Sequence, residues 1–277
     1  FALMMISMIV VMLAMSLESV RRIAEVLSEE STIHNPVDPI YEVKDGSIEF
    51  KNVDFKYNQN AEKFAVENIN ISIKSGDFVG VIGSTGSGKT TLVNLISRLY
   101  DISDGELLVG GVDIKKYDLK TLRKNVATVL QKNILFSGTV KDNLKWGDLN
   151  ATDEEIIEAC KTAQVHDFIV TKPNGYDSYI EQGGTNFSGG QKQRLCIARA
   201  LLCKPKILIL DDSTSAVDTK TDALIREGLK QTHPEVTKIV IAQRISSIEE
   251  ADQIIVLDNG KISGIGTHKE LLENNAI

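Results

Sequence analysis

No charged side chain occurs in the first 17 residues of the chain, which read FALMMISMIVVMLAMSL. A helix of this length would extend about 25 Å, which is short for a bilayer core of about 30 Å. No positive charge precedes the run, so it lacks the n-region of a signal peptide. We therefore expect the last part of a transmembrane helix that begins upstream of residue 1. The alternative, a buried helix of a soluble domain, is also open, although a run without a polar face does not suit a surface helix.

Polar residues take over directly after this run. Arg21 and Arg22 follow it, and the positive-inside tendency places the chain beyond them in the cytoplasm. Apolar positions still recur every three or four residues, so the helix should continue to about Glu30 before two prolines end it. The sequence thus predicts a helical segment over residues 1–30, a linker over 31–46 and a domain on the cytoplasmic side of the cell membrane.

Two different strand patterns follow the linker. Ser47 to Tyr57 and Phe64 to Ile73 alternate apolar and polar positions, which indicates half-buried strands of an antiparallel sheet. Residues 78–83, FVGVIG, are instead an unbroken apolar run that ends in glycine, and a helical pattern from Lys89 to Leu99 comes next. This order fits a strand that is buried on both faces and leads through a loop into a helix.

Similar apolar runs recur further along the chain. Helical patterns separate them, which predicts a parallel α/β sheet. Roughly 75 residues with helical character lie between the first and second of these runs, too many for one crossover. We therefore expect a core over residues 47–277 that carries an inserted helical subdomain at about 133–203. The runs are VATVL from Val126, ILIL from Ile207, KIVIA from Lys238 and QIIVL from Gln253.

The composition is that of a globular protein, with 42% hydrophobic and 25% charged residues. The 31 Lys and Arg residues against 38 Asp and Glu residues give a net charge of −7, which argues against a protein that coats nucleic acid. Three cysteines, Cys160, Cys196 and Cys203, lack the spacing of metal ligands or redox pairs. They are best interpreted as small apolar fillers in a reducing compartment.

A phosphate-binding motif lies between the buried strand at residues 78–83 and the helix after it. GSTGSGKT, Gly83 to Thr90, matches G-x-x-x-x-G-K-[ST]. Its glycines let backbone amides point inward, and the helix N-terminus adds partial positive charge, so the loop can hold an anionic phosphate. Lys89 would add a full charge at the β- and γ-phosphates of ATP. An ordinary glycine-rich turn is the alternative, and the strand-loop-helix context argues against it.

A magnesium site should complete this loop. The hydroxyl of Thr90 would bind Mg²⁺, and the metal needs an aspartate at the end of another buried strand. Asp211 stands in that position, directly after ILIL. The predicted fold class is α/β: a RecA-like P-loop NTPase core with an antiparallel β subdomain and an inserted helical subdomain, preceded by the end of a transmembrane helix.

Further motifs give the chain a specific resemblance. NFSGGQKQR, Asn186 to Arg194, precedes ILILDD by one helix, and SAVD follows at Ser215 to Asp218. Together with the phosphate loop, this order resembles the nucleotide-binding domain of the ABC transporter family over about residues 47–277. ILFSGTVKDNL, Ile134 to Leu144, looks like the exporter branch in particular. The resemblance implies an ATPase that uses ATP and Mg²⁺ and is attached to a transmembrane domain.

The resemblance also implies that two such domains dimerise head to tail around two ATPs, each held between the phosphate loop of one domain and the signature of the other. It assigns Tyr57 to adenine stacking and Gln131 to sensing Mg²⁺ and the membrane domain. A core position for Tyr57 and an ordinary Ser-Gly helix start at Ser188 are the alternatives. The nucleotide set is Tyr57, Gly83, Ser84, Thr85, Gly86, Ser87, Gly88, Lys89, Thr90 and Thr91, with Thr90, Gln131 and Asp211 at the metal. The signature set, facing the partner's ATP, is Phe187, Ser188, Gly189, Gly190 and Gln191, and the D-loop is Ser215, Ala216, Val217 and Asp218.

Two positions depart from the family pattern. Asp212 stands where the family has a glutamate that polarises the attacking water, so the carboxylate is one methylene short. A misplacement of about 1 Å in phosphoryl transfer can cost about 100-fold in rate. Gln243 replaces a histidine that holds the γ-phosphate, and an amide can donate a hydrogen bond but carries no charge. We therefore expect the catalytic set of Asp212, Gln243 and Gln131 to hydrolyse ATP poorly.

The favoured hypothesis is one subunit of a heterodimeric exporter, whose intact signature completes the active site of a different partner chain. An active homodimeric exporter that tolerates Asp212 and Gln243 stays open as the alternative. A soluble ABC ATPase of DNA maintenance fits less well, because the first 17 residues are apolar, the charge is acidic and no heptads appear. A non-enzymatic ATP-binding module is a further alternative. The expected partners are a second half-transporter subunit, the transmembrane domain and the membrane, but no nucleic acid.

Overall fold

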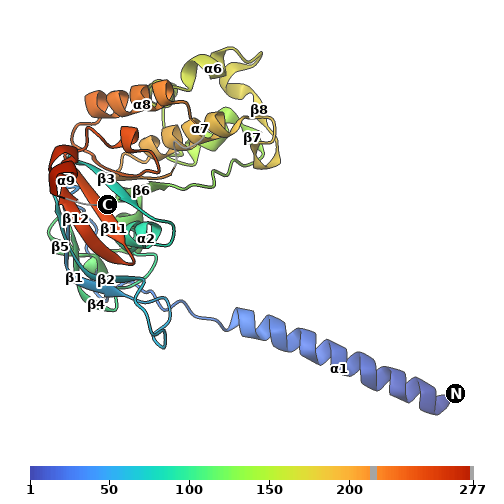
Figure 1. Ribbon diagram of the computed structural model, residues 1–277. Helices are drawn as coiled ribbons and strands as arrows, with labels where there is room; N and C mark the ends of the chain where they lie inside the picture. Colours follow the sequence, from blue (N-terminus) through green and yellow to red (C-terminus); the bar gives the residue numbers. More distant parts are fainter. Residues whose placement is uncertain (213–216, 275–277) are drawn as a thin grey trace. The chain divides into compact units, whose positions relative to one another are not determined.

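Figure 1 shows the computed structural model, which describes residues 1–212 and 217–274. The chain divides into two units, Phe1–His34 and Asn35–Ile277. The first unit contains helix α1, Ala2–Leu27, in which no residue is buried. By length and composition this helix could cross a membrane, whereas the sequence predicted only the last part of such a helix here. The alternative interpretation as a buried helix does not agree with its exposed side chains.

Helix α1 ends at Leu27, three residues before the predicted end at Glu30. The four residues after Leu27 read SEES, and none of them is apolar. The hydrophobic stripe therefore stops where the helix stops, and the predicted end was too late.

The core of the second unit is a six-stranded sheet in the order β12-β11-β3-β10-β9-β6. Five strands are parallel, and β12 joins the edge antiparallel to β11. Every residue of β9 and β10 is buried, which explains why these strands are almost unbroken apolar runs in the sequence. The predicted parallel α/β core is confirmed. Its strands are β3 (Phe78–Gly83), β6 (Val126–Val129), β9 (Ile207–Asp211), β10 (Thr237–Ile241), β11 (Gln253–Asp258) and β12 (Lys261–Gly266).

A second sheet has four strands in the order β2-β1-β4-β5. Neighbouring strands are antiparallel, and buried positions alternate with exposed ones from Ile69 to Ile73. This alternation confirms the predicted antiparallel sheet and shows one of its faces turned to the core. The strands are β1 (Ile48–Phe55), β2 (Val66–Ile73), β4 (Asp104–Val109) and β5 (Val112–Asp113).

Helix α2, Lys89–Ile96, follows β3 and packs its apolar side chains into a core shared with both sheets. The sequence predicted a longer helix that reaches Leu99. Arg98 has a left-handed φ of 47°, which turns the chain out of the helical path, so the predicted end was again too late.

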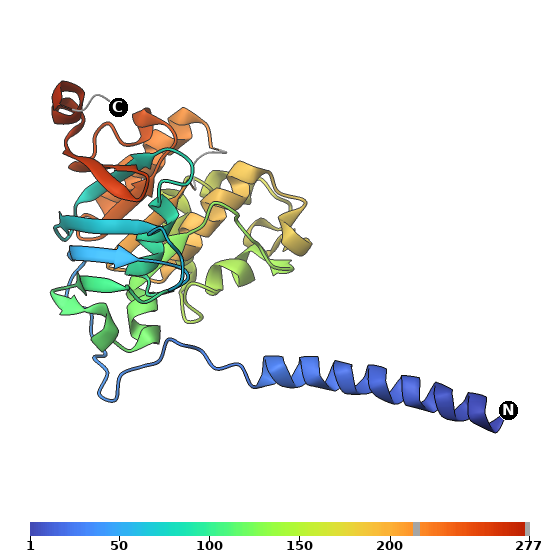
Figure 2. The same ribbon diagram turned by 60° about the horizontal axis from the view of Figure 1, so that its bottom comes forward.

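Between β6 and β9 the chain forms a helical insertion, as predicted. Three of its helices begin with a capping box, among them the one formed by Thr152 and Glu155. Helix α7 contacts both α4 and α5 as well as β6, so it joins the insertion to the sheet. Within the second unit, Figures 1 and 2 show the insertion at the end remote from β1 and β2. Its elements are α4 (Val140–Lys145), α5 (Asp153–Thr162), α6 (His166–Val170) and α7 (Gly189–Leu202), with the short strands β7 (Gly138–Thr139) and β8 (Tyr179–Ile180).

Three further α-helices lie in the described part of the second unit. Helix α8 places Ile225 and Leu229 in a second hydrophobic core, together with Leu208 and Leu210 of β9. This core lies on the face of the six-stranded sheet opposite to α2, because side chains alternate along β9. The helices are α3 (Leu119–Asn125), α8 (Thr219–Thr232) and α9 (His268–Asn274).

The later part of the predicted linker is held to the second unit. Asn35 donates to Asp118 Oδ2 at 2.7 Å and accepts from the amide of Leu119 at 2.8 Å. Val43 is buried, and the hydroxyl of Thr237 donates to the carbonyl of Gly46 at 2.7 Å. The chain is therefore anchored well before β1 begins.

Deleting residues 1–30 should leave the rest of the protein folded, because no residue of α1 is buried. We expect the thermal midpoint, followed by circular dichroism, to change by less than about 2 °C. Deleting residues 1–46 is the matched control, since it also removes buried Val43 and the Asn35 hydrogen bonds, and it should lower the midpoint by about 4 °C or more. A comparable loss on the shorter deletion would show that α1 contributes to the fold.

Candidate functional site

The phosphate loop connects the end of β3 to the start of α2. Gly83 has φ of 151° and Gly88 has φ of 98°, both in the region that favours glycine. A Cβ atom at Gly83 would lie 2.1 Å from the carbonyl oxygen of Leu257 and 2.6 Å from Ser87 Oγ. The loop is therefore packed too tightly against β11 for any side chain at residue 83.

Lys89 is the first residue of α2, and its ammonium group folds back over the loop. Its Nζ donates to the carbonyls of Gly83 and Ser84, each at 2.8 Å. These bonds hold a positive charge beside the N-terminus of α2, where the helix dipole also favours an anion. The arrangement fits a phosphate group, as the motif predicted.

A cleft of about 800 Å³ lies beside this loop. Tyr57 is 57% exposed on its wall, so it is not the core residue of the alternative interpretation. Its hydroxyl lies 2.9 Å from Thr91 Oγ1, and its ring makes edge contacts with Phe55 and Tyr100 at centroid distances of 4.9 and 5.0 Å. These contacts fix the ring in place at the cleft, where it can stack on a planar group.

Several residues of this cleft were missed by the sequence analysis. Gly260 donates its amide to the carbonyl of Ser87 at 3.1 Å, so the turn between β11 and β12 braces the loop. The Asn259-Gly260 pair, with φ of 46° and 79°, is a recognisable hairpin signal, but only the fold brings it beside the phosphate loop. The residues that line the cleft without having been predicted are Glu62, Lys63, Phe64, Ala65, Glu67, Asn259 and Gly260.

Two of the three predicted magnesium ligands, Thr90 and Asp211, lie next to each other, while the third, Gln131, contacts Asp212. Thr90 Oγ1 donates to Asp211 Oδ2 at 3.1 Å, although the two residues are 121 positions apart. Burial raises the pKa of Asp211, and the hydrogen bond from Thr90 opposes this shift. A hydroxyl and a carboxylate beside a phosphate loop form the oxygen donor set that Mg²⁺ prefers, so these residues fit the ion. A bound cation would favour the ionised carboxylate.

The three predicted catalytic residues also come together. Asp212 Oδ2 accepts from Gln131 Nε2 at 3.0 Å and from Gln243 Nε2 at 2.6 Å. Asp212 has an uncommon left-handed φ of 49°, and its amide donates to the carbonyl of Ile241 at 3.0 Å. Burial raises the pKa of the Asp212 carboxyl, while the hydrogen bond from Gln131 lowers it. Both amides occupy the same carboxylate oxygen, which leaves Oδ1 for another donor.

The signature segment lies at the start of helix α7, away from the phosphate loop. Ser188 accepts from the amide of Gln191 at 3.3 Å, and Gln191 Oε1 accepts from the amide of Ser188 at 2.8 Å. A capping box is compatible with both interpretations of Ser188, and it leaves the first amides of the helix pointing outward. Phe187 does not face outward, because it is buried edge-on against Phe168 at 5.7 Å.

The signature and the phosphate loop line separate hollows of the chain. Ser188, Gly189 and Gly190 border a pocket of about 300 Å³ whose other walls are Arg194, Val217 and Asp218. No residue of the phosphate loop lines that pocket. One copy of the chain therefore carries each half of the predicted composite site at a different place.

The predicted D-loop is described only in part, because Ser215 and Ala216 lie outside the described residues. Val217 is buried, and Asp218 caps α8 by accepting from the amide of Thr221 at 3.0 Å. The guanidinium of Arg244 lies 3.5 Å from the carbonyl of Val217. The end of the D-loop is thus connected to the segment that carries Gln243.

A second connection between these segments was not foreseen from the sequence. Asp222 of α8 is buried, and its Oδ2 accepts from Ser247 Oγ at 2.9 Å. Arg226 Nε lies 3.4 Å from the same oxygen. The Asp222–Ser247 hydrogen bond connects α8 to the turn after Gln243. Only the tertiary structure reveals this contact, because the two residues are 25 positions apart.

The cysteines occupy apolar surroundings. Cys160 and Cys196 are buried and Cys203 is partly buried, each as a free thiol. Burial raises the pKa of Cys160 to about 12, which leaves it un-ionised at neutral pH. The interpretation of the cysteines as small apolar fillers agrees with this environment.

An apolar groove of about 550 Å³ runs along β6 and the start of the helical insertion. Phe136 and Trp146 stack at its edge with ring centroids 4.8 Å apart, and both are exposed, at 46% and 66%. Leu130 and Ile134 are also more than half exposed there. Four large apolar side chains gathered at one groove are typical of a surface that another protein segment covers.

The chain is similar in sequence and in structure to known proteins. The family model for ABC transporters matches residues 66–215. Two proteins from Staphylococcus aureus, of strains NCTC 8325 and Mu50, are named as multidrug export ATP-binding/permease proteins. Each is 45% identical to the chain over 250 residues, which is 90% of this chain and 43% of the relative.

A solved structure of a bacterial Atm1-family ABC exporter with ATP bound superposes with a TM-score of 0.89. Its sequence is 32% identical, and the match covers 95% of this chain and 46% of that chain. The chain thus spans less than half the length of these relatives.

Substituting Lys89 by alanine should remove most Mg-ATP binding, because it removes the positive charge that the carbonyls of Gly83 and Ser84 hold over the loop. A loss of affinity of about 100-fold is expected in a fluorescence titration with a labelled nucleotide. Lys161→Ala removes an exposed lysine that pairs with Glu158 on α5 and serves as the matched control. Equal affinities of the two variants would refute the phosphate-loop assignment.

Proposed function

The chain belongs to the ABC transporter family as the ATP-binding domain of an exporter-type protein, and on this premise we propose that it binds and hydrolyses ATP to drive export across a membrane. One observation carries the proposal: the phosphate loop after β3 and the Asp211–Asp212 pair at the end of β9 lie at the same edge of the sheet, on either side of β10, where Thr90 contacts Asp211. ATP and Mg²⁺ are its cofactors. The nucleotide-binding, metal and catalytic sets predicted from the sequence are the residues proposed to act.

The chain's own residues suit distinct tasks in this reaction. Tyr57 stacks on the adenine, Lys89 and the loop amides hold the phosphates, and Thr90 with Asp211 holds the metal. Bound Mg²⁺ neutralises charge on the transferring phosphoryl group. Gln131 and Gln243 both donate to Oδ2 of Asp212. The other oxygen, Oδ1, accepts a hydrogen bond from the attacking water and so orients it.

We further propose that hydrolysis at this site is weak. Asp212 is short, and the 2.6 Å hydrogen bond from Gln243 draws its carboxylate toward the Gln243 segment. Gln243 carries no positive charge that could stabilise the γ-phosphate in the transition state. Both features reduce transition-state stabilisation but need not reduce binding of the nucleotide.

The intact signature supports a partnership with a second subunit. The Ser188 capping box leaves the amides of Gly189 and Gly190 directed outward from the start of α7, where they can bind the γ-phosphate held by another domain. We propose that the partner is a different chain with a competent base. An active homodimer is the second candidate, favoured by the contact of Gln131 and Gln243 with Asp212, which assembles a carboxylate and two amides in one place.

The membrane attachment forms the last part of the proposal. Residues 1–30 are the end of a transmembrane helix and its extension, 31–46 a linker and 47–277 the nucleotide-binding domain on the cytoplasmic side. The exposed apolar groove with Phe136 and Trp146 would receive a segment of the transmembrane domain. Motion at the ATP site could then reach the membrane through Gln131, which is five residues from Phe136.

Two substitutions in this chain should have opposite effects on the assembled transporter. Asp212→Asn should change turnover by about twofold or less, because this site contributes little hydrolysis. Ser188→Arg should lower turnover by about 100-fold, because the arginine would displace the helix N-terminus from the partner's γ-phosphate. Steady-state phosphate release from the reconstituted two-subunit protein measures both. In an active homodimer, Asp212→Asn would remove the base from every site and stop turnover.

Restoring the family's residues should raise hydrolysis at this chain's own site. Asp212→Glu with Gln243→His lengthens the base and supplies a positive charge, and we expect a gain of about tenfold or more when the partner's own site is inactivated. Asp212→Glu alone is the matched control and should give a smaller gain. No gain from the double variant would show that these two residues do not limit hydrolysis.

A further inference from the structure

Lys238 lies near the amino end of β10 in the six-stranded sheet, level with Phe78 of β3. Strand β10 lies between β3 and β9, and all five of its residues are buried. Side chains alternate along a strand, and Lys238 therefore shares a face with Val240, which packs in the core beneath α8 with Leu210. Lys238 is only 6% exposed. An apolar residue would be expected at this position.

The charge of Lys238 is not paired within the part of the chain that the structure describes. No described side chain forms a hydrogen bond or an ion pair with its ammonium group. Burial lowers the pKa of Lys238, and Glu235 and Asp252 act on it in the opposite direction, but only from a distance. The Lys238 Nζ is not among the buried atoms of the described residues that lack a partner, so the stem of the side chain is buried while the ammonium group opens into the space beside it.

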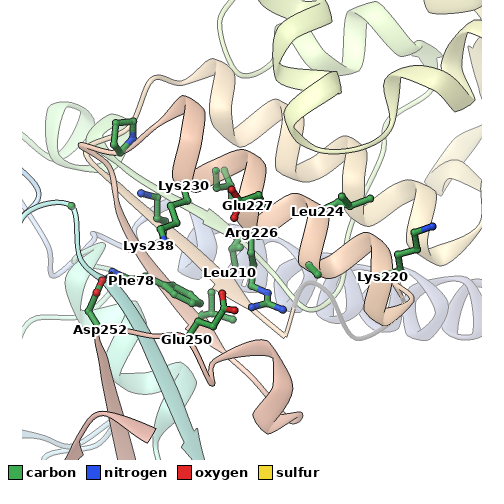
Figure 3. A pocket seen from close by; sticks show the side chains of 15 residues that line it. Phe78, Leu210, Lys220, Leu224, Arg226, Glu227, Lys230, Lys238, Glu250 and Asp252 are labelled. Carbon is green, nitrogen blue, oxygen red and sulfur yellow. Dashed lines mark hydrogen bonds between the residues drawn. The ribbon is translucent and has the colours of Figure 1, made fainter.

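The ammonium group borders a cavity of about 580 Å³ between α8 and the sheet. Phe78 and Leu210 form its apolar middle, and Figure 3 shows Lys230 and Lys238 together at one end. Arg226 lies toward the other end in the same view. A volume of several hundred Å³, an apolar wall and a few polar groups are the usual features of a small-molecule site.

The acidic residues of the cavity are mostly engaged elsewhere. Asp252 Oδ2 accepts from the amide of Phe78 at 2.8 Å, and Glu227 accepts from Gln231. Glu250 is exposed. Among the basic residues, Arg226 is paired with buried Asp222, which leaves Lys230 and Lys238 as the cations at one end of the cavity. The charged residues are Lys220, Glu227, Arg226, Lys230, Lys238, Glu250 and Asp252.

We propose that this cavity binds a small amphipathic carboxylate. The carboxylate lies against Lys238 and Lys230, and its apolar body lies against Phe78, Leu210 and Val240. A singly charged group matches the lining better than a phosphate, because three carboxylates already border the cavity. The site shares no residue with the nucleotide cleft, so it is independent of the proposed ATPase function.

Binding can be tested with the full 277-residue chain in lipid nanodiscs and no nucleotide. The probe is 4′-fluorobiphenyl-4-carboxylate, followed by ¹⁹F NMR, and its neutral carboxamide tests the role of charge. Protein-free nanodiscs provide the correction for partition into lipid. We expect the carboxylate to bind the wild-type chain about tenfold or more tightly than the carboxamide.

Two variants locate the probe. Lys238→Met should reduce carboxylate affinity about tenfold or more and leave the carboxamide unchanged, since only the ion pair is removed. Lys51→Met is the matched control, because Lys51 is an exposed lysine of β1 that pairs with Glu49. Ala223→Phe, on an exposed position of α8 that lines the cavity, should weaken both probes by filling the space.

The proposal is overturned if the wild-type chain binds neither probe, if the carboxylate binds no better than the carboxamide, or if Lys238→Met retains full carboxylate affinity. In those cases only the aliphatic part of Lys238 is buried, and water in the cavity solvates its ammonium group. Thermal unfolding of each variant shows that it is folded. Should Lys238→Met not fold, Ala223→Phe alone decides, because unchanged binding there excludes this cavity.

Discussion

Strand β10 is the constraint on which the functional site depends, because it is hydrogen-bonded to β3 on one side and to β9 on the other. Ile241 pairs with Val81 in β3 and with Asp211 in β9, so the carboxyl ends of three parallel strands form one row. The phosphate loop leaves one end of this row, and Asp212 leaves the other. Parallel pairing thus brings residues 121 positions apart to 3.1 Å, as Thr90 and Asp211 show.

Polar contacts then hold the segments that follow the strands. Asp212 bonds to Gln131 and Gln243, while Arg244 and Ser247 bond to the start of α8. These contacts link the loop after β6, the loop after β10 and the D-loop. A change at the nucleotide would therefore act on several loops through short side-chain bonds, whereas the sheet beneath them is packed on both faces and cannot move easily.

Two features of the described residues expose apolar surface that a soluble chain normally covers. The groove with Phe136 and Trp146 exposes large apolar side chains to solvent. Helix α1 is an apolar segment in which no residue is buried. By length and composition this helix could cross a membrane.

The sequence by itself determined the element types and the chemistry of the phosphate loop. Unbroken apolar runs, alternating runs and the GSTGSGKT motif depend on local periodicity and backbone freedom, which a chain displays without being folded. It also identified Asp211, Asp212 and Gln243 by position. The ends of α1 and α2 were placed too late, because periodicity says little about where a helix stops. Only the tertiary structure decided that Gln131 and Gln243 share one oxygen of Asp212, that the turn with Asn259 and Gly260 braces the phosphate loop, and that the stem of Lys238 is buried beneath α8. The reason is that pairing between distant strands, and not local preference, determines which side chains meet.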